Sequence, residues 1–144
     1  MKKNIQPQKP EPAYRSRLKA EKANELYIKI IEKLTREKLY RDPKYNTFQL
    51  AADLNTNTRY ISAAVAVCTG SNYSALVNKL RLRDVLKMMQ SVQYKSMTVE
   101  EIGLMAGFSS RQAFYLAFHR VYDCTPRAYR LQLNQQKNKE NNEK

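Results

Sequence analysis

The stretch VEEIGLMAGFSSRQAFYLAFHRVYDCTPRAYR, residues 99–130, decides the fold. Thr98 stands before it and Glu101 follows three residues later. This is the spacing of a capping box, in which a hydroxyl and a carboxylate satisfy free N–H groups at a helix start. Gly107-Phe108-Ser109 then turns the chain, and a second helix is expected over about residues 110–121. The local sequence therefore predicts two helices joined by a tight turn.

The second of these helices has an apolar face with helical spacing. Its inward side chains are predicted to be Ala113, Phe114, Ala117, Phe118 and Val121. Phe108 and Tyr129 are expected to join its aromatic residues in the core. Thr125-Pro126 supplies an N-cap and a first-turn proline for a final helix that ends near Gln132. The polar residues 134–144 are predicted to be a disordered tail.

The upstream half of the chain is also helical in pattern. Apolar residues at four-residue steps, among them Ile30 and Leu34, predict an amphipathic helix over about residues 16–40. The following Asp42-Pro43 ends this helix because a residue before proline avoids the helical conformation. Residues 1–15 carry prolines and basic residues, so they are predicted to be a disordered basic tail.

Two short helices and one long helix follow. Thr47 is the predicted N-cap of the helix FQLAADL, and a second short helix is expected over Thr58–Val67. The inner face of that second helix is predicted to contain Tyr60, Ile61, Ala64 and Val65. Thr69-Gly70 stops it, and a longer helix spans about residues 73–90. Since no segment shows strand alternation, the predicted fold class is all-α with about seven helices.

The two halves form an internal repeat. Ile61 corresponds to Phe114 at an offset of 53 residues, and Ala51 corresponds to Gly103 at an offset of 52. Ala51 and Gly103 would lie where two helices cross steeply, a place that requires a small residue. Each half is therefore predicted to be a helix-turn-helix subdomain, over residues 16–90 with the linker helix and over residues 91–133. An ordinary helical bundle with helix hairpins is the alternative.

Composition narrows the possible partners. The chain of 144 residues has 26 Lys and Arg against 13 Asp and Glu, a net charge of +13. Such an excess favours a polyanionic partner, although a merely soluble basic protein is the alternative. Two cysteines and one histidine without a ligand motif argue against a zinc site. No signal peptide or membrane span is found, so a cytoplasmic setting without membrane contact is expected.

The stretch 99–130 resembles the second helix-turn-helix of the AraC/XylS family of transcription regulators. The matching positions are Ile102, Ala106, Gly107, Phe108, Ser109, Phe114, Phe118, Arg120, Thr125, Pro126, Tyr129 and Arg130. The first half also looks like the family at Leu50, Ala51, Leu54, Tyr60, Ile61, Ser62, Thr69, Gly70, Asn78, Arg81 and Leu82. The resemblance covers about residues 24–133. It implies a two-lobed, seven-helix domain whose long linker helix lets two recognition helices enter successive major grooves.

The sequence departs from the family pattern on its recognition helices. Family members often carry arginine at the positions that are Ala63 and Leu116 here. The usual Phe-Lys-Lys run is Val65-Ala66-Val67, and Asp123-Cys124 displaces a glycine. The first recognition helix therefore has a weakly charged outer face, and two reading heads of unequal strength are expected. Many relatives also have a ligand-sensing domain, which is not expected here, and no small-molecule effector site or cofactor is predicted.

Two sets of DNA-contacting residues are predicted from these positions. The base-reading candidates are Arg59, Ser62, Ala63, Arg111, Gln112, Tyr115 and Leu116. Arg59 can pair with guanine and Gln112 with adenine, whereas Tyr115 and Leu116 would contact either thymine methyl groups or a partner protein. The phosphate-contact candidates are Thr47, Thr58, Lys79, Ser109, Ser110, Arg120 and Arg127. Arg81 and Arg130 are predicted to brace helices.

These features predict a sequence-specific, DNA-binding transcription regulator whose partner is double-stranded DNA, with RNA polymerase as a second candidate partner. The alternatives are a non-specific architectural DNA-binding protein and a protein-interaction adaptor on the same helical fold. An enzyme is not expected, because the lone His119 has no partner at a motif spacing and no phosphate-binding loop is present.

Overall fold

The computed structural model describes residues 13–143, with side chains from residue 19 onward. Within this range the chain forms seven α-helices and two short 3-10 helices and contains no strand, which confirms the all-α prediction. The predicted basic tail, residues 1–15, lies outside the described residues except for its last three, which begin the first helix. No helix among the described residues is long and apolar enough to cross a membrane.

The first lobe forms around a long amphipathic helix. Its elements are α1 (Ala13–Arg36), the 3-10 helix η1 (Leu39–Arg41), α2 (Thr47–Asp53) and α3 (Thr58–Thr69). α3 packs across α1. The core between them is aliphatic and contains Ile30, Leu34, Leu50, Ile61 and Val65. The apolar stripe that predicted α1 is therefore the side on which the first lobe is built.

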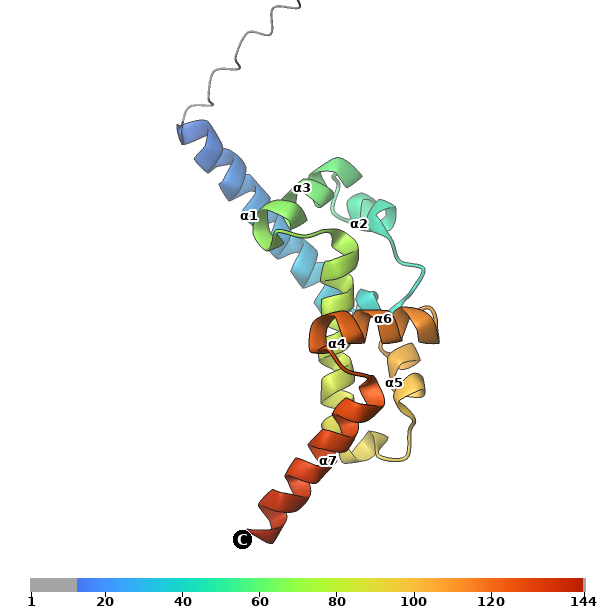
Figure 1. Ribbon diagram of the computed structural model, residues 1–144. Helices are drawn as coiled ribbons and strands as arrows, with labels where there is room; N and C mark the ends of the chain where they lie inside the picture. The colour runs from blue at the N-terminus through green and yellow to red at the C-terminus, as the bar shows by residue number, and fades with distance from the viewer. Residues whose placement is uncertain (1–12, 144) are drawn as a thin grey trace, which may run out of the picture.

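α4 (Tyr73–Gln90) links this lobe to a second one and has the predicted bounds. Its first half contributes Leu76, Val77 and Leu80 to the first core. Its second half contributes Leu82, Val85 and Met89 to a separate core. The second lobe continues with η2 (Val92–Tyr94), α5 (Val99–Met105), α6 (Arg111–Tyr122) and α7 (Pro126–Asn142). Figure 1 shows α2 and α3 beside the upper part of α4, and α5 and α6 beside its lower part.

Two helix starts or ends in the first lobe differ from the predictions. α1 ends at Arg36 instead of near residue 40, because Lys38 turns into the left-handed conformation (φ 52°) and η1 follows. The N-cap of α2 is Asn46 and not Thr47, which is the first helical residue. The Asn46 amide oxygen accepts the N–H of Gln49 at 3.1 Å, and the Gln49 amide oxygen accepts the N–H of Asn46 at 3.0 Å. This reciprocal pair is a capping box with amide side chains.

The prediction that the final helix ends near Gln132 is wrong, because α7 continues to Asn142. Most of the segment expected to be a disordered polar tail is therefore helical. Two contacts attach this extension to the second lobe. Leu133 packs against the second core, and the Lys137 ammonium donates to the Gln90 carbonyl at the end of α4 at 2.8 Å.

Two apolar residues face away from the cores to which they were assigned. Tyr60 is 59% exposed and Val121 is 57% exposed. The remaining predictions for these faces hold at Ile61, Phe114 and Phe118, which are all buried. Since one residue turns the helix by about 100°, Tyr60 lies beside the buried stripe that passes through Ile61 instead of within it.

A set of contacts that we call the joint fixes the two lobes to each other. Asp84 on α4 is buried and accepts the Tyr40 hydroxyl at 2.6 Å and the Arg41 Nε–H at 2.8 Å. Burial, with the neighbouring Asp84, raises the pKa of Tyr40 to about 12, so the phenol stays a proton donor. The buried carboxylate therefore holds η1 of the first lobe against α4.

The joint continues into the turn of the second lobe. The Arg81 Nε–H donates to the Tyr40 carbonyl at 2.6 Å, and the Arg81 guanidinium lies 5.6 Å from the centre of the Phe108 ring. Gly107 has φ +115°, and a Cβ added there would lie 2.4 Å from the Tyr40 carbonyl oxygen. Arg130 donates to the Met97 carbonyl, so the bracing roles predicted for Arg81 and Arg130 are confirmed.

Candidate nucleic-acid interface

The first helix-turn-helix is α2, a short turn and α3. Leu50 and Ala51 of α2 are both buried and pack into the core of the first lobe. Asn55 adopts the left-handed conformation in the turn (φ 54°), which asparagine tolerates better than most residues. Asn57 then caps α3, because its side-chain oxygen accepts the N–H of Tyr60 at 2.9 Å. Local hydrogen bonds thus set where this recognition helix begins.

The second helix-turn-helix consists of α5 and α6, which approach each other closely at Gly103. The predicted capping box is confirmed, with hydrogen bonds of 3.0 and 3.1 Å between Thr98 and Glu101. A Cβ at Gly103 would lie 2.4 Å from the ring of Phe114, so the predicted need for a small residue at this crossing is confirmed. The Ser110 hydroxyl accepts the N–H of Ala113 at 3.1 Å and caps α6.

Six of the seven predicted base-reading residues are exposed on the recognition helices. Arg59, Ser62 and Ala63 lie on the surface of α3. Arg111, Gln112 and Leu116 lie on the surface of α6, and Leu116 is 69% exposed. Neither Arg59 nor Arg111 has a hydrogen-bond or ion-pair partner among the described residues. These side chains are therefore free to contact a ligand from outside the chain.

Tyr115, the seventh candidate, is half-buried and held by an acid. Its hydroxyl donates to the carboxylate of Glu100 on α5, which also accepts the Arg127 guanidinium at 2.9 Å. The hydrogen bond from Tyr115 lowers the pKa of Glu100, and the same bond raises the pKa of Tyr115. Glu100 therefore connects a predicted base-reading residue to a predicted phosphate contact on α7. Glu100 was not predicted as a site residue from the sequence, because its partners Tyr115 and Arg127 lie 15 and 27 residues away in the chain.

Six of the predicted phosphate contacts lie in three separate places. Thr47, Thr58, Ser109 and Ser110 lie at the starts of helices α2, α3 and α6. Arg120 lines a shallow hollow with Leu116 and Thr125, and so lies next to the outer face of α6. Lys79 lies apart from the helix starts, because it lines a hollow with Thr69 and Ser71 beyond the C-terminal end of α3.

Two exposed aromatic residues lie in the first helix-turn-helix. Phe48, in the first turn of α2, is 74% exposed, and Tyr60 is exposed next to Arg59. The sequence assigned Tyr60 to the core and gave Phe48 no role. Both side chains are available for apolar contact with a partner.

The paired helices with exposed second members define a DNA-binding class of protein, the double helix-turn-helix domain. A family model described as a helix-turn-helix domain matches residues 50–132, more than half of the 144 residues. The chain belongs to this family, which is the AraC type of helix-turn-helix, and its role is that of a DNA-binding transcription regulator. No curated protein and no solved structure matched the chain.

Proposed function

We propose that the protein is a sequence-specific regulator that reads two successive major grooves with α3 and α6. The supporting observation is that both recognition helices are capped, expose Arg59 and Gln112 outward, and belong to lobes held by one buried joint. Fixed lobes present both helices to one duplex without the ordering cost of a flexible linker. The net charge of +13 supplies the non-specific attraction to phosphate.

The two helices have different roles in this proposal. α6 offers Arg111 and Gln112 near its start, with Leu116 one turn later, so it can combine hydrogen bonds to base edges with apolar contact to thymine methyl groups. α3 offers one charged base-reading residue, Arg59, beside Ser62 and Ala63. The second helix-turn-helix therefore supplies most of the sequence discrimination.

Selection of bound sequences from random duplexes tests this proposal. We expect a bipartite motif whose half-sites are centred about 10 base pairs apart, since that is one turn of DNA. The half-site with the stronger base preference should be the one that α6 contacts, so substitutions on the outer face of α6 should abolish the preference there. Equal binding to all duplexes, measured with random competitor DNA at fixed salt, would contradict specific reading and indicate an architectural protein.

A further inference from the structure

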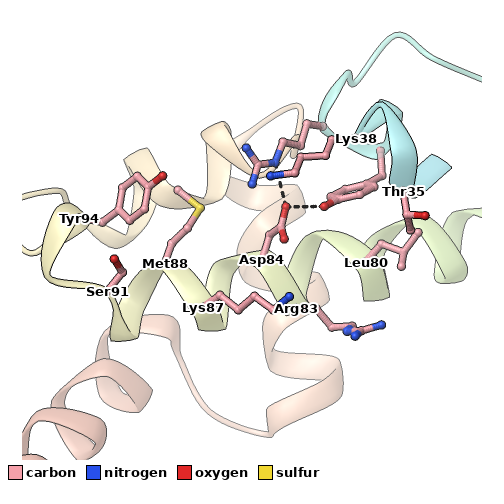
Figure 2. A pocket seen from close by; sticks show the side chains of 11 residues that line it. Thr35, Lys38, Leu80, Arg83, Asp84, Lys87, Met88, Ser91 and Tyr94 are labelled. Carbon is pink, nitrogen blue, oxygen red and sulfur yellow. Dashed lines mark hydrogen bonds and ion pairs between the residues drawn. The ribbon is translucent and has the colours of Figure 1, made fainter. Parts of the chain in front are cut away.

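A basic hollow lies beside α4 where the two lobes meet. Its volume is about 470 Å³, and its walls come from the end of α1, η1, α4 and η2. Figure 2 shows Asp84 near the middle of its floor, Tyr94 and Met88 at one end, and Arg83 and Lys87 along α4. This volume is within the range of sites that hold small ligands, about 300–1,000 Å³.

The charges around the hollow are not balanced. Its lining contains four cations, Lys38, Arg41, Arg83 and Lys87, and a single carboxylate, Asp84. Arg41 is paired with Asp84 at 2.8 Å. The other three cations have no ion-pair or hydrogen-bond partner among the described residues. Glu37, next to Lys38 in the chain, pairs with Lys33 instead. Three uncompensated positive charges therefore surround one concave surface, where they reinforce one another's field.

The hollow has no lining residue from α6, the helix whose outer face is expected to contact DNA. Arg83 and Lys87 are four residues apart and share one face of α4, whereas Leu82, Val85 and Met89 face the second core from the other side of the same helix. Figure 1 shows α6 crossing in front of α4 and the end of α1 passing behind it. The lining residues Tyr40 and Arg41 lie against the Gly107 turn that precedes α6, so the two surfaces are neighbours that share no residue.

We propose that this hollow binds a small phosphate-bearing anion of the size of a nucleotide. Lysine and arginine are the side chains that bind phosphate oxygens by charge-assisted hydrogen bonds. The half-buried Tyr94 and the buried Met88 supply an apolar wall for the organic part of such a ligand. Lys38, Arg83 and Lys87 would hold the phosphate. This inference does not rest on the proposed reading of two grooves.

Titration calorimetry at fixed ionic strength tests the proposal with inorganic pyrophosphate, adenosine triphosphate and adenosine as probes. We expect saturable binding of one pyrophosphate per chain, binding of the nucleotide at least as tight, and none of adenosine. The double variant R83Q/K87Q should bind pyrophosphate about a hundredfold more weakly, because each of the two charge-assisted contacts contributes about a factor of ten. Both residues are exposed and unpartnered, so folding should be unaffected.

The matched control is K29Q/K139Q, which removes two exposed lysines outside the hollow. Its net charge is the same as that of R83Q/K87Q. It should bind pyrophosphate as the unaltered chain does. Absence of saturable binding, or an equal loss in the control, would overturn the proposal. A second measurement, the affinity for duplex DNA, completes the test. If R83Q/K87Q weakens DNA binding as much as it weakens pyrophosphate binding while the control does not, the cluster is a DNA contact and the proposal is wrong.

Discussion

Gly103 lies where α5 and α6 cross, and a single methyl group there would meet the ring of Phe114. Gly103→Ala should destabilise the protein by about 1–3 kcal/mol, the usual cost of overpacking a core. The higher helix propensity of alanine would by itself stabilise the protein by about 1 kcal/mol. A net loss of stability would therefore show that Gly103 lies too close to the Phe114 ring to accept a methyl group. Urea unfolding measures the change. Leu104→Ala in the same helix, at a 54% exposed position, should shift stability by no more than about 0.5 kcal/mol.

Glu100 is the only buried acid on α5, α6 or α7 among the described residues, and it neutralises part of a surface expected to meet DNA. Its pKa is lowered, chiefly by the Tyr115 hydrogen bond, so the carboxylate stays charged at neutral pH. The stability from this bond is present above the ordinary carboxyl pKa and is lost as pH falls through the lowered value.

Glu100→Gln should therefore increase affinity for DNA at neutral pH, because it removes a negative charge and frees the Arg127 guanidinium for a phosphate. The slope of log affinity against log salt concentration should steepen by about one, as for one added phosphate contact. Fluorescence anisotropy at several salt concentrations measures both quantities. Tyr115→Phe keeps the Glu100–Arg127 ion pair and should leave the slope unchanged. Weaker DNA binding by Glu100→Gln would show that Arg127 does not contact phosphate.

At the scale of elements, local signals decided where most helices begin and end. The Thr98–Glu101 capping box, the Thr125-Pro126 start and the stop at Gly70 all hold, because each depends on residues within four positions. α7 was predicted to be too short, since its last turns are polar and their stabilising contacts, such as Lys137 to Gln90, come from residues far apart in sequence. Periodicity identifies a helix only where one face is apolar.

The recognition helices are the elements whose side chains should carry sequence preference. Arg59→Ala and Gln112→Ala should each relax the preference at one position, the two positions lying about one helical turn apart, at a cost of about 1–3 kcal/mol. Competition binding against single-base variants of the selected site measures this. Arg36→Ala removes an exposed cation at the end of α1 and should leave the preference unchanged. A uniform loss of affinity across all sequences would mean that Arg59 and Gln112 contact the backbone only.

At the scale of the whole molecule, the joint was the part that the sequence did not reveal. Tyr40 and Arg41 reach Asp84 across 44 and 43 residues, and no periodicity or spacing marks such a pair. Gly107 was predicted as a turn residue, but its contact with the Tyr40 carbonyl depends on how the lobes dock. The sequence could thus predict both helix-turn-helix units, but not the contacts of Asp84 that lie between the two lobes.

Asp84→Asn tests whether this joint sets the spacing between the two heads. The substitution keeps the size of the side chain but leaves Arg41 without an ionic partner, so unfolding free energy should fall by about 1–3 kcal/mol. If the joint fixes the lobes, selection from random duplexes should return half-sites with a broader range of separations. Glu140→Gln on the exposed side of α7 is the matched control and should leave the separations unchanged. A destabilised Asp84→Asn variant with an unaltered spacing preference would show that the packing of α4 against both cores, and not the joint, places the recognition helices.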